Sequence, residues 1–354
     1  MKNSILVYRL FDVAEEINLD FVEKNLAQQR PTSRMRLSRI RPKSIQFKNP
    51  PVAVELGEHP VKIQEQNFKV FFTGKIYDLG VIAIIMRIPL RDDAGYEEIK
   101  KLAVDLYNAD EIEPVFMQQL DYIRKALAPA LVKEAFSGFV EDFTVFYFRE
   151  WDSSFDPAPL LLAEQEPISN QARRETLRYS FSYGDDDLTI ITWDSALVYD
   201  STGSADIPDL LEFANSQLLE LRYYDSLLTD EMEKMYNAIE EAEKVASFRR
   251  LGHYRRIMSQ LMELIVDVTE ITERIDNALK VTEDVFYSRI YGAALSIFRT
   301  KTWADSINRK ISIINQSYTM LSNRIINQRS ELLELTIVLL ILLEVVLGVL
   351  GFIK

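Results

Sequence analysis

Few side chains in this sequence are of the types that carry out catalysis, and they lie far apart along the chain. There is no cysteine, which excludes disulfides, thiolate chemistry and cysteine-ligated metal centres. The two histidines are His59 and His253, and His59 lies in a turn-like run at 57–60. Gly74-Lys75 lacks the upstream glycine of a phosphate-binding loop, and the sequence has no nucleophile elbow, dinucleotide-binding turn or H-E-x-x-H motif. We therefore predict that the protein is not an enzyme and uses no cofactor or bound metal.

Three consecutive aspartates at 185–187 are the best candidate for a cation site, because Mg²⁺ and Ca²⁺ prefer carboxylate oxygens. The same run follows Gly184 and separates two strand-like segments, which is typical of a hairpin turn. The hairpin is the interpretation that the pattern favours.

A basic segment at 30–48 is the strongest local charge bias in the chain. Its cations are Arg30, Arg34, Arg36, Arg39, Arg41, Lys43 and Lys48. The segment is either a solvated surface that balances acidic regions elsewhere or a site for a phosphate-rich partner, namely an anionic lipid or an RNA. The formal net charge of −13 argues against nucleic-acid binding by the molecule as a whole.

The region that must position these side chains, 1–205, is predicted to be an α+β domain. Its strands are predicted at 5–10, 52–56, 68–73, 81–88, 143–148, 177–183, 188–193 and 196–199. Its helices are predicted at 13–29, 95–108 and 113–128. Because strands and helices do not alternate strictly, we expect an antiparallel or mixed sheet.

Residues 206–330 are predicted to form a long antiparallel helical stalk, because apolar residues recur there at the alternating spacing of a heptad pattern. The three apolar stripes run from Leu211 to Ala246, from Ile257 to Ala278 and from Ile307 to Ile325. Asp225 is the polar member of the first stripe, and Gly252-His253 suits a turn between the first two helices. Such helices pack either as a compact bundle within one chain or as a coiled coil between copies.

The run at 335–353 is apolar apart from Glu344. At ~1.5 Å per residue a helix of this length spans roughly 28 Å, close to the ~30 Å hydrocarbon core of a bilayer. We therefore predict a single C-terminal transmembrane anchor at 331–354. The absence of a secretory signal, with Arg324 and Arg329 before the run, predicts a single-pass protein of the inner membrane with its N-terminal domain in the cytoplasm.

Glu344, Gly348 and Gly351 fall on one face of that helix, at positions i, i+4 and i+7. Glycines let two helices approach closely, and a carboxyl in an apolar helix needs a hydrogen-bonding partner. We predict that this face is a helix–helix contact in a homo-oligomer. The alternative is a monomeric anchor in which Glu344 is neutral.

Two blocks carry a family resemblance, LLEFANSQLLELRYYDSLL at 210–228 and NQRSELLELTIVLLILLEVVLGVL at 327–350. The ending resembles the required-for-meiotic-nuclear-division family, domain-of-unknown-function membrane proteins with a glutamate in an L-E-V/I-x-L-G-like run, here at 343–348. The resemblance implies an N-terminal α+β domain, long helices and one membrane helix, and it carries over no catalytic residue. A eukaryotic member lies on the mitochondrial inner membrane and supports translation there, whereas the bacterial members have no assigned activity.

The layout is also similar to that of CorA-type magnesium channels, but the Gly-Met-Asn pore motif and a second span are absent. Together these features predict a tail-anchored, oligomeric membrane scaffold or interaction protein with a cytoplasmic α+β domain and an unidentified protein partner. The alternative is a CorA-like ion transport or channel-related protein that lacks the usual pore motif.

Overall fold

A computed structural model describes residues 2–26, 32–34, 49–134, 136–244, 247–278 and 285–352 of the chain. The chain divides into two compact units. The first, which we call the sheet unit, comprises Met1–Tyr223 and Glu273–Trp303. The second, the helical unit, comprises Tyr224–Thr272 and Ala304–Lys354. The two units are described separately below.

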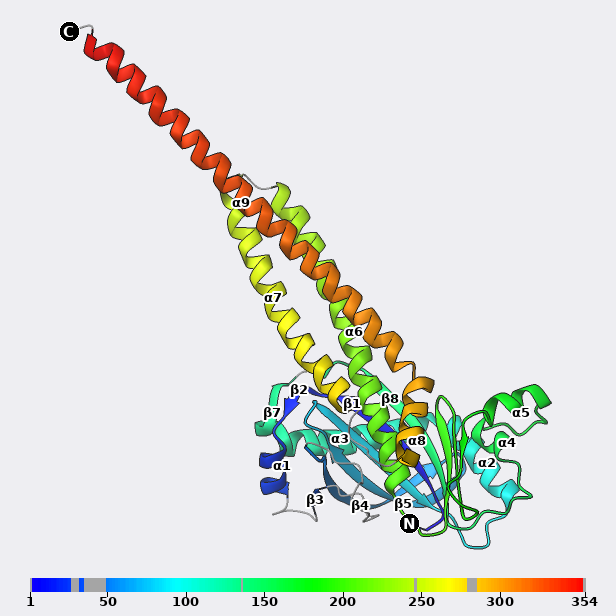
Figure 1. Ribbon diagram of the computed structural model, residues 1–354. Helices are drawn as coiled ribbons and strands as arrows, with labels where there is room; N and C mark the ends of the chain where they lie inside the picture. Colours follow the sequence, from blue (N-terminus) through cyan, green and yellow to red (C-terminus); the bar gives the residue numbers. More distant parts are fainter. Residues whose placement is uncertain are drawn as a thin grey trace. The chain divides into compact units, whose positions relative to one another are not determined.

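A nine-stranded mixed sheet forms the centre of the sheet unit (Figure 1). In spatial order its strands are β3 (Thr32–Arg34), β4 (Val52–Ile63), β5 (Gln66–Ile76), β6 (Val81–Pro89), β1 (Ser4–Asp12), β8 (Val140–Phe148), β11 (Ser195–Asp200), β10 (Asp187–Ile191) and β9 (Ser180–Phe181). Strand β1 is central and pairs antiparallel with both β6 and β8, whereas β11 pairs parallel with β8. The mixed sheet confirms the α+β class predicted for this part of the chain.

Helices cover both faces of the sheet, so β1 is apolar on both sides. Ile5, Val7 and Phe11 face one core, which is closed by α1 (Leu19–Leu26), α2 (Tyr96–Tyr107), α3 (Glu113–Leu127) and α4 (Pro157–Leu161). Leu6 and Tyr8 face the other core, which is closed by α8 (Val285–Ile297) and the first part of α6 (Asp206–Lys244). A strand buried on both faces reads as a continuous apolar run, which is why the sequence of β1 shows little alternation.

Short elements complete the sheet unit. They are the two-stranded sheet of β2 (Ala14–Ile17) and β7 (Leu131–Glu134), the short helix α5 (Asn170–Thr176), and the 3₁₀ turns Asp110–Ile112 and Ala128–Ala130. The helix predicted at 13–29 is therefore wrong in its first half. Val13 donates its backbone N–H to Gly80, and Ala14 and Ile17 pair with β7, so tertiary pairing overrides the local helical pattern. Helix α1 begins only after Asn18, whose side chain accepts the N–H of Phe21.

Three long helices form the helical unit: α6 beyond Tyr223, α7 (Ser247–Ala278) as far as Thr272, and α9 (Thr300–Phe352) from Ala304. Each buries apolar side chains at seven-residue intervals. The buried residues are Leu228, Met235 and Ala242 of α6, Tyr254, Leu261 and Val268 of α7, and Ile307, Ile314 and Leu321 of α9. Among the residues whose side chains the structure describes, burial thus follows the predicted heptad spacing. The turn predicted at Gly252-His253 is wrong, since α6 ends at Lys244 and α7 runs through these residues; a helix tolerates one glycine at a cost of about 1 kcal/mol.

The polar member of the first stripe, Asp225, has its partner on α9. Lys310 lies 2.7 Å from the Asp225 carboxylate and also donates to the Asp225 carbonyl at 2.7 Å and to the Thr229 hydroxyl at 2.6 Å. The lysine thus joins α6 to α9 by three polar contacts. Asp225 interrupts the apolar stripe because it binds this cation.

The predicted transmembrane anchor is contradicted: no helix within the described residues is long and apolar enough to cross a membrane. The expectations that depended on the anchor, a tail-anchored single-pass protein of the inner membrane with a cytoplasmic domain, are corrected with it.

Candidate functional site

A buried ionic cluster joins β5 to α6 within the sheet unit. The Lys75 ammonium lies 2.7 Å from an oxygen of Asp209 and 2.5 Å from an oxygen of Glu212. The second oxygen of Glu212 accepts the Tyr77 hydroxyl at 2.8 Å. The Glu212 side chain is fully buried, and those of Lys75 and Asp209 are 10% and 16% exposed. Both carboxylate oxygens of Glu212 therefore accept a hydrogen bond.

The local geometry of a strand and a helix explains how these residues meet. Alternation along β5 places Lys75 and Tyr77 on the face that carries α6, while Gly74 and Ile76 point to the opposite core. Asp209 and Glu212 are three residues apart and so share one face of α6. The Tyr77 ring stacks on Phe213 with centroids 6.1 Å apart, which holds the phenol against the helix.

Electrostatics keep the lysine charged. Burial by itself lowers the pKa of Lys75. The carboxylates of Asp209 and Glu212 together raise it by a larger amount, so the pKa lies above its ordinary value. Burial raises the pKa of Tyr77 and of Tyr8, and the nearby Glu212 adds to both shifts. A protonated lysine and two neutral phenols provide no nucleophile or general base at neutral pH. The arrangement is suited to fastening α6 to the sheet.

A buried acidic pair forms where Glu220, further along α6, lies near Asp12 at the end of β1. Glu220 and Asp12 are 1% and 2% exposed, and one oxygen of each has no hydrogen-bond partner in the described part of the chain. Burial, then the charges of Asp12 and Asp78, raise the pKa of Glu220 well above its ordinary value. Burial also raises the pKa of Asp12 to about 6, against a hydrogen bond from Ser137 that lowers it. Within the described ranges, no group of three or more His, Cys, Asp or Glu side chains could hold a metal ion.

The predicted basic site falls almost entirely outside the described residues. Arg34 lies in β3, which pairs with β4 through Val52. The other members of the set, Arg30, Arg36, Arg39, Arg41, Lys43 and Lys48, lie outside the described residues. Binding of an anionic lipid or RNA by this segment stays a prediction.

The aspartates at 185–187 form a hairpin turn between β9 and β10. The Asp187 carboxylate accepts the N–H groups of Tyr183 at 2.9 Å and Gly184 at 2.6 Å, and Asp186 accepts the Ser201 hydroxyl at 2.9 Å. His59 lies 3.2 Å from the Leu56 carbonyl and edge-on to Phe72. These contacts are those of structural residues.

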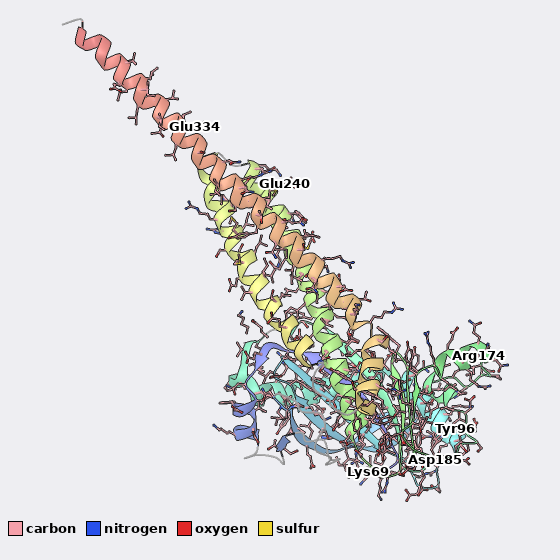
Figure 2. All side chains as sticks on the ribbon, viewed as in Figure 1. Lys69, Tyr96, Arg174, Asp185, Glu240 and Glu334 are labelled. Atoms are coloured by element: carbon pink, nitrogen blue, oxygen red, sulfur yellow. The ribbon has the colours of Figure 1, made fainter. Side chains whose placement is uncertain are left out.

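The predicted contact face on the last helix remains on α9. Glu344 is exposed, and Gly348 and Gly351 lie in the final turns of the helix. Around Glu344 the helix exposes a continuous apolar surface, which we call the α9 apolar segment, and Figure 1 shows α9 continuing past the ends of α6 and α7. Its members are Leu333, Leu335, Ile337, Val338, Leu339, Leu340, Ile341, Leu342, Leu343, Val345 and Val346. Figure 2 labels Glu334 at its beginning. The pairing of these helices stays a prediction.

The buried polar face of α6 was not predicted from the sequence. Its signal was present as Asp209, Glu212, Ser216 and Glu220, at spacings of three and four within an apolar block. Polar residues at helical spacing ordinarily indicate a solvated face. Only the sheet, which contributes Lys75 from about 134 residues away, turns this face inward.

The fold defines an α+β sheet domain followed by a coiled-coil-like helical region. The chain belongs to the family described as "Uncharacterized protein MJ0711, N-terminal domain", whose model matches residues 2–206. The match therefore ends where α6 begins. The chain is also similar to "Uncharacterized protein MJ0711" of Methanocaldococcus jannaschii, with 26% identity over 268 residues, covering 71% of this chain and 78% of the relative. This match is longer than the domain, so the similarity continues into the helices.

No solved structure matches the chain. The resemblances to the required-for-meiotic-nuclear-division family and to CorA-type channels stay predictions.

Proposed function

We propose that the protein is a self-associating interaction protein, in which the helical unit joins copies of the chain and the sheet unit presents binding surfaces. The observation that carries the proposal is the α9 apolar segment, whose large side chains are 46–64% exposed. Single exposed apolar residues are common, whereas a contiguous apolar surface marks an interaction site.

A second copy of the chain is the partner that fits best. Most soluble oligomers are symmetric assemblies of one chain, and α9 already packs by heptad spacing against α6 and α7. In the proposed contact, α9 helices meet along the face of Glu344, Gly348 and Gly351. The glycines let the backbones approach closely, and each Glu344 carboxyl finds a hydrogen-bonding partner on the facing helix.

Because the chain has no cysteine, single cysteine substitutions report this contact without background. Leu340 and Leu342 are 59% and 63% exposed, so they form a matched pair. Leu340 is about 40° from Glu344 around the helix axis, whereas Leu342 is about 160° away. We expect Leu340→Cys to form disulfide-linked dimers under mild oxidation and Leu342→Cys to remain largely uncross-linked.

The same contact predicts that Gly348→Ile combined with Gly351→Ile separates the helices, and that Glu344→Gln preserves assembly because an amide still forms hydrogen bonds. Subunit counting by native mass spectrometry distinguishes these outcomes. Wild-type protein that is monomeric, or equal cross-linking at positions 340 and 342, contradicts the proposed function.

A further inference from the structure

The hairpin formed by β4 and β5 leaves part of the sheet edge open within the sheet unit. Pairing between β5 and β6 ends at Phe71 and Arg87, whereas β6 continues beside β1 as far as Pro89 opposite Ser4. Leu90 then donates its N–H to Asn3, so the chain follows β1 away from β5. Consequently, the β5 residues from Gln66 to Val70 pair with β4 on one side, and no described strand pairs with them on the other.

The register identifies which backbone groups face the open side. Lys69 pairs with Pro60, and proline has no N–H to donate. This is therefore a non-hydrogen-bonded pair of the β4–β5 ladder, in which the N–H and C=O of Lys69 point away from β4. By alternation the same holds for Asn67. Two residues thus direct two N–H and two C=O groups toward the open side.

A groove of about 500 Å³ lies along this edge. Its apolar lining includes Phe68 and Phe71 of β5, Leu90 directly after β6, and Ile99 and Leu102 of α2. The charges at its rim are already paired. Lys69, labelled in Figure 2, lies 2.8 Å from Glu58, and Arg91 lies 2.8 Å from Glu98. The groove therefore offers apolar surface and backbone hydrogen bonds without a marked preference for either charge.

The hairpin end is fixed in place. Its two-residue turn is anchored by Gln64, whose N–H lies 2.5 Å from a Glu111 oxygen and whose side chain donates to the Asn108 carbonyl at 3.3 Å. The edge is consequently preformed, which lowers the entropic cost of binding.

We propose that the β5 edge at Asn67 and Lys69 binds an extended peptide of a partner protein by strand addition, with one apolar peptide side chain placed against Ile99 and Leu102. The backbone of the peptide bonds to Asn67 and Lys69 in the position that β6 vacates, and alternate side chains determine selectivity. An extended strand is the occupant because it satisfies the four backbone groups that no described strand pairs, which a compact ligand or a helix leaves unmatched.

The test uses a phage-displayed random heptapeptide library selected on the full chain, followed by fluorescence anisotropy with the enriched peptides. Lys69→Pro removes the N–H that faces the groove, and Lys69→Ala removes the same side chain but keeps that N–H. We expect Lys69→Pro to weaken binding at least about tenfold, because a carbonyl of the bound peptide then has no N–H donor. Lys69→Ala keeps this donor and should leave binding nearly unchanged. Urea unfolding of both variants shows whether the sheet unit stays folded.

Backbone N-methylation of the peptide provides a test that leaves the protein intact. Methylation at alternate residues on the side facing β5 should abolish binding, whereas methylation at the intervening residues should be tolerated. Failure to enrich any peptide, equal binding to the proline and alanine variants, or indifference to the position of the methyl groups would overturn strand addition at this edge.

Discussion

Helix α6 passes through two environments, and its two parts have different interiors. In the sheet unit, side chains are buried on every side of the helix from Leu210 to Leu221, including the charged Glu212 and Glu220. In the helical unit, burial is largely confined to a stripe of Leu228, Met235 and Ala242. A polar group in the first part must find a partner within the fold, whereas one in the second part can turn to water. The two parts of α6 therefore differ in whether their polar side chains need partners within the protein.

The strongest test of this difference is removal of the buried cation. Lys75→Met leaves Glu212 buried without its positive partner, and we expect a loss of about 3–5 kcal/mol in the free energy of unfolding, measured by urea denaturation. Adding Glu212→Leu to the same variant should restore part of the loss, because the uncompensated carboxylate is gone. A loss below about 1 kcal/mol for Lys75→Met would show that water reaches the cluster.

The acidic pair at Asp12 and Glu220 predicts a pH dependence specific to the sheet unit. Burial raises the pKa of Asp12 from 3.8 to about 6, so the folded state holds this proton more tightly than the unfolded state. The associated stability is complete below about pH 4 and is lost as pH rises through 6, by on the order of 3 kcal/mol at ~1.4 kcal/mol per pKa unit. Asp12→Asn should flatten the urea midpoint between pH 4 and 7. If the urea midpoint of the variant depends on pH as steeply as that of the wild type, a group other than Asp12 binds the proton.

The smallest expected effect belongs to the ion pair of the helical unit. Lys310 and Asp225 are 19% and 17% exposed, and water can replace part of their interaction. We expect Lys310→Met to cost about 1 kcal/mol, well below Lys75→Met. Lys244→Met, which removes an exposed pair with Glu240, should produce no measurable change. If Lys310→Met costs as much as Lys75→Met, the proposed contrast between the two parts of α6 is wrong.

Agreement with the sequence was closest where the pattern is local. The strands around Ile5, Val81 and Phe143, and the helices from Tyr96 and Glu113, occur where predicted. In the part of the helical unit whose side chains the structure describes, the buried residues also follow the predicted heptad spacing. In the helical unit each stripe meets another stripe of the same period, so the pattern within one helix is sufficient to predict its buried face.

Disagreement occurred where distant segments decide the outcome. The residues 14–17 became a strand because β7 pairs with them, and α7 runs through Gly252, where a turn was predicted. The predicted membrane span is wrong. It was based on hydropathy alone, and high hydropathy is equally a property of the exposed α9 apolar segment. Of the cations in the basic segment at 30–48, only Arg34 lies in the described sheet, so the role predicted for the segment stays a prediction.

The sequence by itself determined the α+β and helical regions, the heptad stripes and the hairpin at 185–187, because each follows from spacing or turn chemistry within a few residues. Only the tertiary structure decided that Lys75 pairs with Asp209 and Glu212, and that β6 leaves the edge of β5 open at Lys69. The physical reason is the same in both cases. The free energy of a buried charge, or of an unpaired strand edge, depends on what another part of the chain places beside it.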